Sequence, residues 1–191
     1  MAHAIISQAV LLGTLAGTYA LLPGNHRVLH ATGPSSTRTP SRQAESNTAL
    51  NCGVLAICDS AESPDALRLK TLQLQRLVRH RGPDGSGIHV IEHGEARSSS
   101  LAHERLAIVD PLSGNQPLFS HDSTLICSVN GEIYNHKELE AGLKDRTPFR
   151  TGSDCEVIPH LYAEVGVDVA SMLDGDFAFV VVDEKSGEVN F

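Results

Sequence analysis

The chain runs Val129-Asn130-Gly131-Glu132-Ile133-Tyr134-Asn135-His136 at the end of an apolar, β-prone run. This order places the Asn130 side-chain amide beside the Gly131 backbone N–H, and two such donors can stabilise the oxyanion of a tetrahedral intermediate. We call Asn130 and Gly131 the oxyanion cradle. An Asn-Gly pair between apolar runs is also a strong signal for a hairpin turn. The continuation Glu132–Asn135, which a hairpin does not require, favours the cradle.

Four further motifs stand in order around this stretch. They are Cys52-Gly53-Val54, Arg79–Gly87, Ala102–Asp110 and Thr151–Ile158. Together the five motifs closely resemble the glutamine-hydrolysing domain of the asparagine synthetase family, which are class II amidotransferases with an N-terminal-nucleophile fold. The resemblance runs from Cys52 to Phe191, about three quarters of the chain.

Apolar, β-prone runs separated by Gly, Pro, Asp and Ser predict a sheet-rich fold. The predicted strands are Gly53–Cys58, Ile88–Glu92, Leu101–Val109, Leu125–Val129 and Phe177–Val182. Several gaps between them are too short for helical crossovers, so the sheets should be antiparallel. The resemblance sharpens this α+β prediction to an N-terminal-nucleophile four-layer αββα sandwich of two antiparallel sheets. The sandwich should be C-terminally incomplete, because family members continue past the position of Phe191.

The first helix should follow the first strand. Ser63-Pro64-Asp65 supplies a hydroxyl N-cap, a proline at the first helical position and an acid in the first turn. The residues expected on its apolar face are Leu67, Leu74, Leu77 and Val78. The glycine-rich segment Arg79–Gly87 lacks the Lys-Ser/Thr of a phosphate-binding loop, so we expect it to form part of a pocket.

Two more helices are predicted before the last strand. Asn135 caps a short helix through Leu143. Ser153 and Glu156 form a capping box that opens the next helix. Pro159 falls beyond the first turn of that helix, where a proline removes one backbone hydrogen bond and should cause a kink.

The 191 residues fit one core with an appendage. Residues 1–51 hold three Arg and a single acid, whereas residues 52–191 hold twelve bases and twenty-two acids. We therefore divide the chain into an N-terminal extension, 1–51, and a partial class II glutamine amidotransferase domain, 52–191. Clustered Lys and Arg on the folded part would mark a nucleic-acid binder, so no nucleic-acid partner is expected. The spacing of the four cysteines suits neither a disulfide framework nor a zinc site, and no metal is expected.

The extension is targeting-like or disordered by composition. Ala4–Leu22 carries no charged residue and resembles the apolar region of a secretory signal, although the usual basic start is missing. Its length lies at the lower end of what spans a membrane. His26–Thr48 is rich in Ser, Thr and Arg, as disordered and transit segments are. Three explanations stay open: a targeting peptide, upstream sequence from a wrong start or splice assignment, and a membrane anchor.

Cys52 is the candidate nucleophile. A free thiol is only a few per cent thiolate near neutral pH, so it needs a base. In the resembling family this cysteine is the first residue of the mature chain, and its own α-amine, with a pKa of roughly 7.7 to 8.0, is that base. Here Leu50-Asn51 acylates the Cys52 nitrogen, which then cannot accept a proton. Either the bond before Cys52 is cut, or the extension is not part of the protein, or the site is inactive. A small buried residue at the start of a strand is the other interpretation of Cys52.

A free amino acid presents a carboxylate and an ammonium group, so its site needs one fixed cation and one fixed anion. Arg105 offers the two-pronged donor that suits a carboxylate, and Asp154 offers the anion. Seen alone, Arg105 could form a surface salt bridge with Glu104 or Asp110, and Asp154 could be the first-turn acid of a capped helix. The resemblance implies Cys52, Asn130 and Gly131 as catalytic residues. It places glutamine against Arg105, Leu106, Ala107, Ile108, Val109, Asn130, Gly131, Glu132 and Asp154.

The resemblance implies hydrolysis of the side-chain amide of L-glutamine, which would supply ammonia for ATP-dependent asparagine synthesis from aspartate in the full-length enzyme. It implies no cofactor in this chain, because ATP and Mg²⁺ would bind the missing C-terminal synthetase domain, and it allows a homodimer of the full-length enzyme. Three alternatives stay open: a non-catalytic glutamine-binding or interaction module, the glutaminase domain of another class II amidotransferase, and, if Ala4–Leu22 spans a membrane, a membrane-anchored pseudoenzyme. The cysteine usage indicates a reducing compartment and hence the cytoplasm, unless the extension targets an organelle, the secretory pathway or a membrane.

Overall fold

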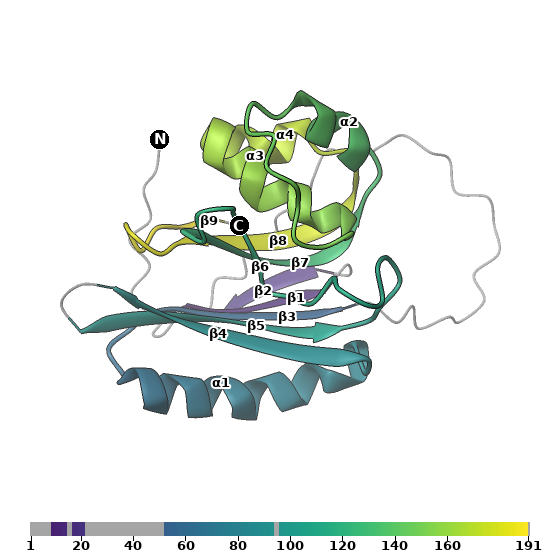
Figure 1. The fold of residues 1–191 in the computed structure, drawn as a ribbon. Helices are drawn as coiled ribbons and strands as arrows, with labels where there is room; N and C mark the ends of the chain where they lie inside the picture. Colours follow the sequence, from purple (N-terminus) through teal and green to yellow (C-terminus); the bar gives the residue numbers. More distant parts are fainter. Residues whose placement is uncertain (1–8, 15–16, 22–51, 94–95, 191) are drawn as a thin grey trace.

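Two antiparallel sheets pack face to face, and helices cover the outer face of each (Figure 1). The computed structural model describes residues 9–14, 17–21, 52–93 and 96–190. One sheet has five strands in the order β2-β1-β3-β5-β4, and the other has four in the order β6-β7-β8-β9. The predicted α+β sandwich, with its αββα layers, is confirmed.

The five-stranded sheet contains the first five strands of the part of the chain that is described. They are β1 (Ala9–Thr14), β2 (Gly17–Leu21), β3 (Gly53–Ser60), β4 (Gly85–His93) and β5 (Arg97–Arg105). Helix α1 (Pro64–Val78) lies on its outer face (Figure 1). The strand predicted at Leu101–Val109 is wrong in its second half. β5 ends at Arg105, because the residues after it bond to other segments and leave the sheet.

Strands β1 and β2 come from the segment that composition marked as targeting-like or disordered. β1 pairs with β3, with Leu11 opposite Ala56, and so extends the sheet at the β3 edge. For these eleven positions the structure has a hairpin, which the sequence did not predict. The other predictions for the extension lie outside the described residues. Among the residues that are described, no helix is long and apolar enough to cross a membrane.

Helix α1 begins as predicted. The Ser63 Oγ accepts the Ala66 N–H at 3.4 Å, and Pro64 is the first helical residue. Its buried face is marked by Leu67, Thr71 and Gln75, which are spaced by about one turn. The prediction that Leu77 lies on this face is wrong. Leu77 is 68% exposed, because ten residues after Leu67 the helical period has turned it toward solvent.

The four-stranded sheet is built around two long paired strands, β7 and β8. Its members are β6 (Leu118–Phe119), β7 (Leu125–Ile133), β8 (Gly175–Asp183) and β9 (Val189–Asn190). Helices α2 (His136–Gly142), α3 (Val157–Val165) and α4 (Val169–Met172) lie on its outer face (Figure 1). β7 passes through the oxyanion cradle and pairs with β8 as far as Ile133 opposite Gly175. A hairpin turn at the cradle is therefore excluded.

Two helix predictions need correction. Asn135 stands directly before α2, but its side chain bonds to the Met172 carbonyl and the Asp174 N–H instead of capping the helix. Pro159 is the third residue of α3. The first N–H groups of a helix have no intrahelical partner, so the missing N–H at Pro159 gives no cause for a kink.

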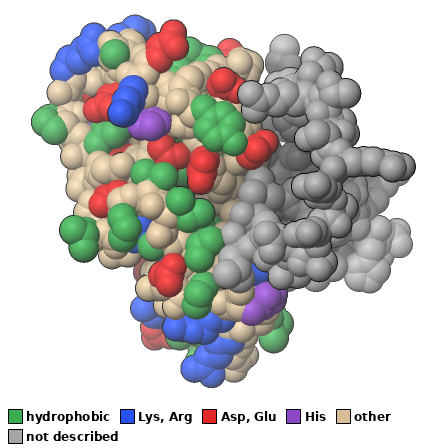
Figure 2. All heavy atoms as spheres, turned by 90° about the vertical axis from the view of Figure 1, so that its right-hand side faces the viewer, with side chains coloured by type: hydrophobic (Ala, Val, Ile, Leu, Met, Phe, Trp, Pro, Cys, Tyr) green, Lys and Arg blue, Asp and Glu red, His purple; other side chains and the backbone are tan. Residues whose placement is uncertain are grey.

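The apolar core has two parts, one between the sheets and one between the four-stranded sheet and α3. Leu101, Ile126 and Val180 belong to the first, and Val129, Ile158 and Leu161 to the second. On the face in Figure 2, acidic, basic and apolar side chains are interspersed, and basic ones gather at the level of α1.

Candidate active site

A cavity of about 250 Å³ opens where the ends of β5 and β7 meet. Among the described residues its lining comes from five places: the start of β3, the loop after β5, the end of β7, the turn before α3 and the start of β8. The predicted site residues that line it are Cys52, Arg105, Leu106, Ile108, Val109, Asn130, Gly131, Glu132 and Asp154. The fold therefore brings residues from all these segments to one place.

Ala107 is the predicted site residue that does not line the cavity. Its N–H instead donates to the Asp84 Oδ2 at 2.9 Å, and the Asp84 N–H donates to the Arg105 carbonyl at 3.0 Å. The Arg79–Gly87 segment, which we expected to form part of the pocket, thus lies behind the loop after β5 and supports it.

Cys52 lies immediately before β3. The Leu106 N–H donates to its Sγ at 3.2 Å, and the Sγ lies 3.6 Å from the Leu106 carbonyl oxygen. Burial raises the pKa of the Cys52 thiol, and this outweighs the lowering by the Leu106 N–H and the Arg105 guanidinium. The thiol therefore needs a base. In the described part of the chain, the residues that line the cavity include no histidine.

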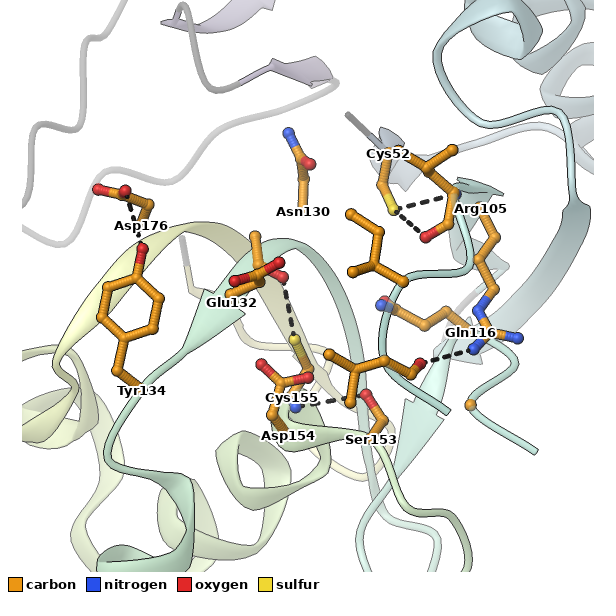
Figure 3. Close-up of a pocket in the computed structure, with 15 residues that line it drawn as sticks. Cys52, Arg105, Gln116, Asn130, Glu132, Tyr134, Ser153, Asp154, Cys155 and Asp176 are labelled. Atoms are coloured by element: carbon orange, nitrogen blue, oxygen red, sulfur yellow. Dashed lines mark hydrogen bonds between the residues drawn. The ribbon is translucent and has the colours of Figure 1, made fainter. Parts of the chain in front are cut away.

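Asn130 presents a buried donor to the cavity. The residue is 1% exposed, and its Nδ2 has no hydrogen-bond partner among the described residues. A buried polar group left without a partner costs about 1–3 kcal/mol. Figure 3 shows the Asn130 side chain between Cys52 on one side and Tyr134 on the other. Such a donor is explained where a ligand supplies the acceptor.

Gly131 presents a second donor to the same space. Successive residues of an antiparallel strand direct their backbone groups to opposite edges. The Leu125 carbonyl accepts the Ser120 N–H on the β6 side, whereas the Tyr134 N–H donates to the Asp174 carbonyl on the β8 side. Gly131 therefore turns its N–H toward the β6 edge, where the cavity lies. Its φ of 142° and the 2.0 Å between an added Cβ and the Asp176 carbonyl oxygen require glycine here.

Arg105 is buried and holds the loop that follows it. Its Nη2 donates to the Val109 carbonyl at 3.1 Å and to the Asp110 carbonyl at 2.5 Å. Glu104 pairs instead with Arg79, at 3.5 Å. The surface salt bridge considered for Arg105 is therefore wrong, since the guanidinium is inside and bonds backbone oxygens at the cavity.

Asp154 opens a short 3₁₀ turn (Asp154–Glu156) directly before α3. The residue is 5% exposed, and its Oδ2 accepts the Ile133 N–H at 2.6 Å. This contact ties the turn to the end of β7. Glu132 lines the cavity together with Asp154, so two carboxylates can face a bound cation.

Glu156 anchors this turn from behind. Its carboxylate accepts the Arg150 N–H at 2.6 Å and the Thr151 N–H at 2.7 Å. The Ser153 Oγ accepts the Cys155 N–H at 3.3 Å. The predicted capping box is thus half correct. The serine caps the turn, but the buried glutamate accepts hydrogen bonds from the segment before Ser153.

Six lining residues were not among the predicted site residues: Gly114, Gln116, Tyr134, Ser153, Cys155 and Asp176. The Tyr134 hydroxyl donates to the Asp176 Oδ2 at 3.0 Å, and this pair lies across the cavity from Cys52 (Figure 3). Tyr134, Ser153 and Cys155 stand inside quoted motifs, so motif membership was the available signal. Gln116 stands in none.

Family comparison agrees with this geometry. Residues 51–191 match the model of the glutamine amidotransferase domain. The chain belongs to this amidotransferase family. Similar proteins include the glutamine-hydrolyzing asparagine synthetase 1 of Arabidopsis thaliana, which is 53% identical over 134 residues, or 70% of this chain and 22% of that protein. The corresponding enzyme of Sandersonia aurantiaca is 53% identical over 135 residues, or 71% of this chain and 25% of that protein.

The maize (Zea mays) glutamine-hydrolyzing asparagine synthetase is 52% identical over 134 residues, which are 70% of this chain and 22% of that protein. This amidotransferase domain is therefore homologous to the corresponding part of the asparagine synthetases. The chain spans about a fifth to a quarter of the length of these relatives.

Proposed function

We propose that this chain hydrolyses the side-chain amide of L-glutamine, and that the ammonia serves ATP-dependent asparagine synthesis from aspartate in the full-length enzyme. The Asn130 Nδ2 has no partner among the described residues, and it lies beside the Gly131 N–H in one cavity with the Cys52 thiol, which supports the first part. The names of the relatives support the second. ATP, Mg²⁺, a homodimer and a cytoplasmic location belong to this proposal for the full-length enzyme.

Glutamine suits the cavity by charge. The carboxylates of Glu132 and Asp154 would hold its ammonium group, and the Arg105 guanidinium would hold its α-carboxylate. Arg105 already bonds the Val109 and Asp110 carbonyls. Through the Arg105 side chain, the α-carboxylate of bound glutamine would therefore be linked to the loop after β5.

Hydrolysis then follows from the positions of the donors. The Cys52 Sγ attacks the amide carbon, and the carbonyl oxygen becomes an oxyanion that accepts from the Asn130 Nδ2 and the Gly131 N–H. The α-amine of residue 52 takes the thiol proton and passes it to the leaving nitrogen, so the C–N bond breaks and ammonia departs. Water hydrolyses the remaining thioester to glutamate and restores the thiol.

The α-amine step requires that the Asn51–Cys52 peptide bond be cut, because the Cys52 nitrogen is an amide in the intact chain. A chain carrying a protease recognition sequence directly before Cys52 keeps every described residue and exposes the amine on cleavage. We expect glutamate and ammonia from the cut chain only. Cys52→Ser should lower kcat by roughly a thousandfold or more.

The controls separate the two parts of this proposal. Equal glutamine hydrolysis by the cut chain and its Cys52→Ser variant would remove Cys52 as the nucleophile. Equal hydrolysis before and after cutting would remove the α-amine as the base. Mass mapping after treatment with an electrophilic glutamine analogue should locate the adduct on Cys52.

The acylated Cys52 nitrogen favours a second function for the intact chain, namely glutamine binding without turnover. The cavity and its carboxylates do not depend on the cut. Isothermal titration of the intact chain with glutamine should then show binding, while the same sample releases no ammonia.

A further inference from the structure

Gln116 contacts β7 one residue before the oxyanion cradle. Its Oε1 accepts the Val129 N–H at 2.7 Å, and its Nε2 donates to the Val129 carbonyl at 3.0 Å. A single side-chain amide thus bonds both backbone groups of one residue. Gln116 also lines the cavity, on the same side as Cys52 and Arg105 (Figure 3).

Strand register explains why a side chain is needed here. β6 begins at Leu118, which pairs with Cys127 of β7, so the ladder does not extend to the residues before Leu118. Continuing that antiparallel register by two residues puts Gln116 opposite Val129. The Gln116 backbone lies against β4 instead of β7: a Cβ added to Gly87 of β4 would lie 1.9 Å from the Gln116 carbonyl oxygen. The side-chain amide therefore takes the place of a neighbouring strand.

The same edge of β7 is held by side chains on the far side of the cradle. The Cys155 Sγ donates to the Gly131 carbonyl at 3.5 Å, and the Asp154 Oδ2 accepts the Ile133 N–H at 2.6 Å. With Gln116 bonding Val129, this edge is fixed both before and after the two donors of the cradle. The Gly131 N–H, between these contacts, stays directed at the cavity.

We propose that Gln116 is a positioning residue for glutamine hydrolysis, whose amide fixes the Val129 peptide groups and thereby the directions of the Asn130 amide and the Gly131 N–H. The inference rests on the proposed glutaminase function. An error of about 1 Å in such a group can cost about a hundredfold in rate. The amide bonds β7, so its loss should act on kcat more than on KM.

Gln75 offers a matched control. It is a buried glutamine, whereas Gln116 is half-buried, and its Nε2 donates to the Gly87 carbonyl at 3.3 Å and to the His103 carbonyl at 3.0 Å. It belongs to α1, on the outer face of the five-stranded sheet and away from β7 (Figure 1). Replacing either glutamine by Met removes the same amide and keeps the length of the side chain.

The test uses the full chain, cut before Cys52, in steady-state kinetics. Gln116→Met should lower kcat by about 10- to 100-fold with KM within about threefold. Gln75→Met should lower the Tm and leave kcat within about twofold. Hydrogen exchange should speed up around Val129 in Gln116→Met only.

Gln116→Glu adds a pH readout. A charged carboxylate repels the Val129 carbonyl, whereas a protonated carboxyl donates to it as the amide does. The kcat of Gln116→Glu relative to that of the unsubstituted chain should therefore rise as the pH falls from about 8 to about 5, toward the ordinary pKa of Glu. If Gln116→Met does not fold, the pH dependence of kcat in Gln116→Glu tests the positioning role instead.

The outcomes are distinct. An unsubstituted cut chain that releases no ammonia would overturn the glutaminase proposal and the role of Gln116 with it. An active chain whose kcat is unchanged by Gln116→Met would overturn the positioning role alone. An equal loss of kcat in Gln75→Met would also overturn it, because the effect would then come from general stability.

Discussion

The two walls of the cavity differ in their exposure to solvent and in the side chains that bond them. The strand wall is β7 from Val129 to Ile133, and the loop wall is the segment Leu106–Leu112. Side chains from separate parts of the chain bond the strand wall at three of its residues. In the loop wall Ile108 is 61% and Leu112 is 94% exposed.

The Arg105 guanidinium bonds three loop-wall carbonyls, and the Asp84 carboxylate and the Cys52 thiol each accept one loop-wall N–H. This comparison indicates that the two oxyanion donors, whose direction matters to the reaction, lie on the strand wall, where they need not reorganise during the reaction. We expect the wall toward solvent to be the one that moves when a substrate enters. Each experiment below disturbs one wall and uses the other as reference.

The largest effect is expected from Asn130→Ala, in the strand wall. Loss of one oxyanion donor costs about 100- to 1,000-fold in kcat. The Tm should not fall much, because the Asn130 Nδ2 has no partner among the described residues. Steady-state kinetics and thermal unfolding of the cut chain measure both. A kcat within twofold of the unsubstituted value would show that the strand wall does not supply this donor.

Arg105→Lys should act on the loop wall, with an intermediate effect. Lys cannot replace a two-pronged donor, so kcat/KM should fall about 10- to 100-fold. Limited proteolysis should cut the loop wall faster while the strand wall stays protected.

Arg97→Lys is the matched control for this experiment. The Arg97 guanidinium also donates to a backbone carbonyl, that of Asp59, at 2.9 Å, at the other end of β5. Unchanged proteolysis in Arg105→Lys would mean that the guanidinium is not what holds the loop wall.

The smallest effect concerns pH and Asp110. Hydrogen bonds from Ser113 and the Gly152 N–H hold the pKa of the Asp110 carboxyl below its ordinary value. A depressed pKa means that these contacts stabilise the fold above the ordinary pKa and are lost as pH falls through the depressed one, below about pH 4.

Hydrogen exchange, corrected for its intrinsic pH dependence, should therefore speed up in the loop wall before the strand wall as acid is added. Asp110→Asn should remove that difference. Simultaneous loosening of both walls in the unsubstituted chain would contradict the separation between them.

The sequence predicted the strand wall better than the loop wall. β7 begins with the local apolar run Leu125–Val129, and the cradle directly follows this run within the same strand. Leu106–Val109 is just as β-prone, but the Asp84 carboxylate binds Ala107 from 23 residues away and Arg105 turns back on Val109. A local sequence pattern does not predict which side chains will bond this segment.

Gln116 was missed for the same reason. Its role depends on the register of β6 against β7 and on the position of Gly87, which only the folded chain brings together. The β1–β2 hairpin was also missed, since an apolar run alone does not say which edge it will pair with.

The pairing of β1 with β3 has a consequence for any cut at the Asn51–Cys52 bond. Five residue pairs, from Ala9 opposite Cys58 to Gly13 opposite Val54, join the two strands. Cutting would convert the chain into a two-part complex held by this ladder, in which the occupancy of β3 by the amino-terminal piece depends on dilution. A synthetic peptide with the sequence of that piece could then exchange onto β3, and departure of the piece would expose the β3 edge to other strands.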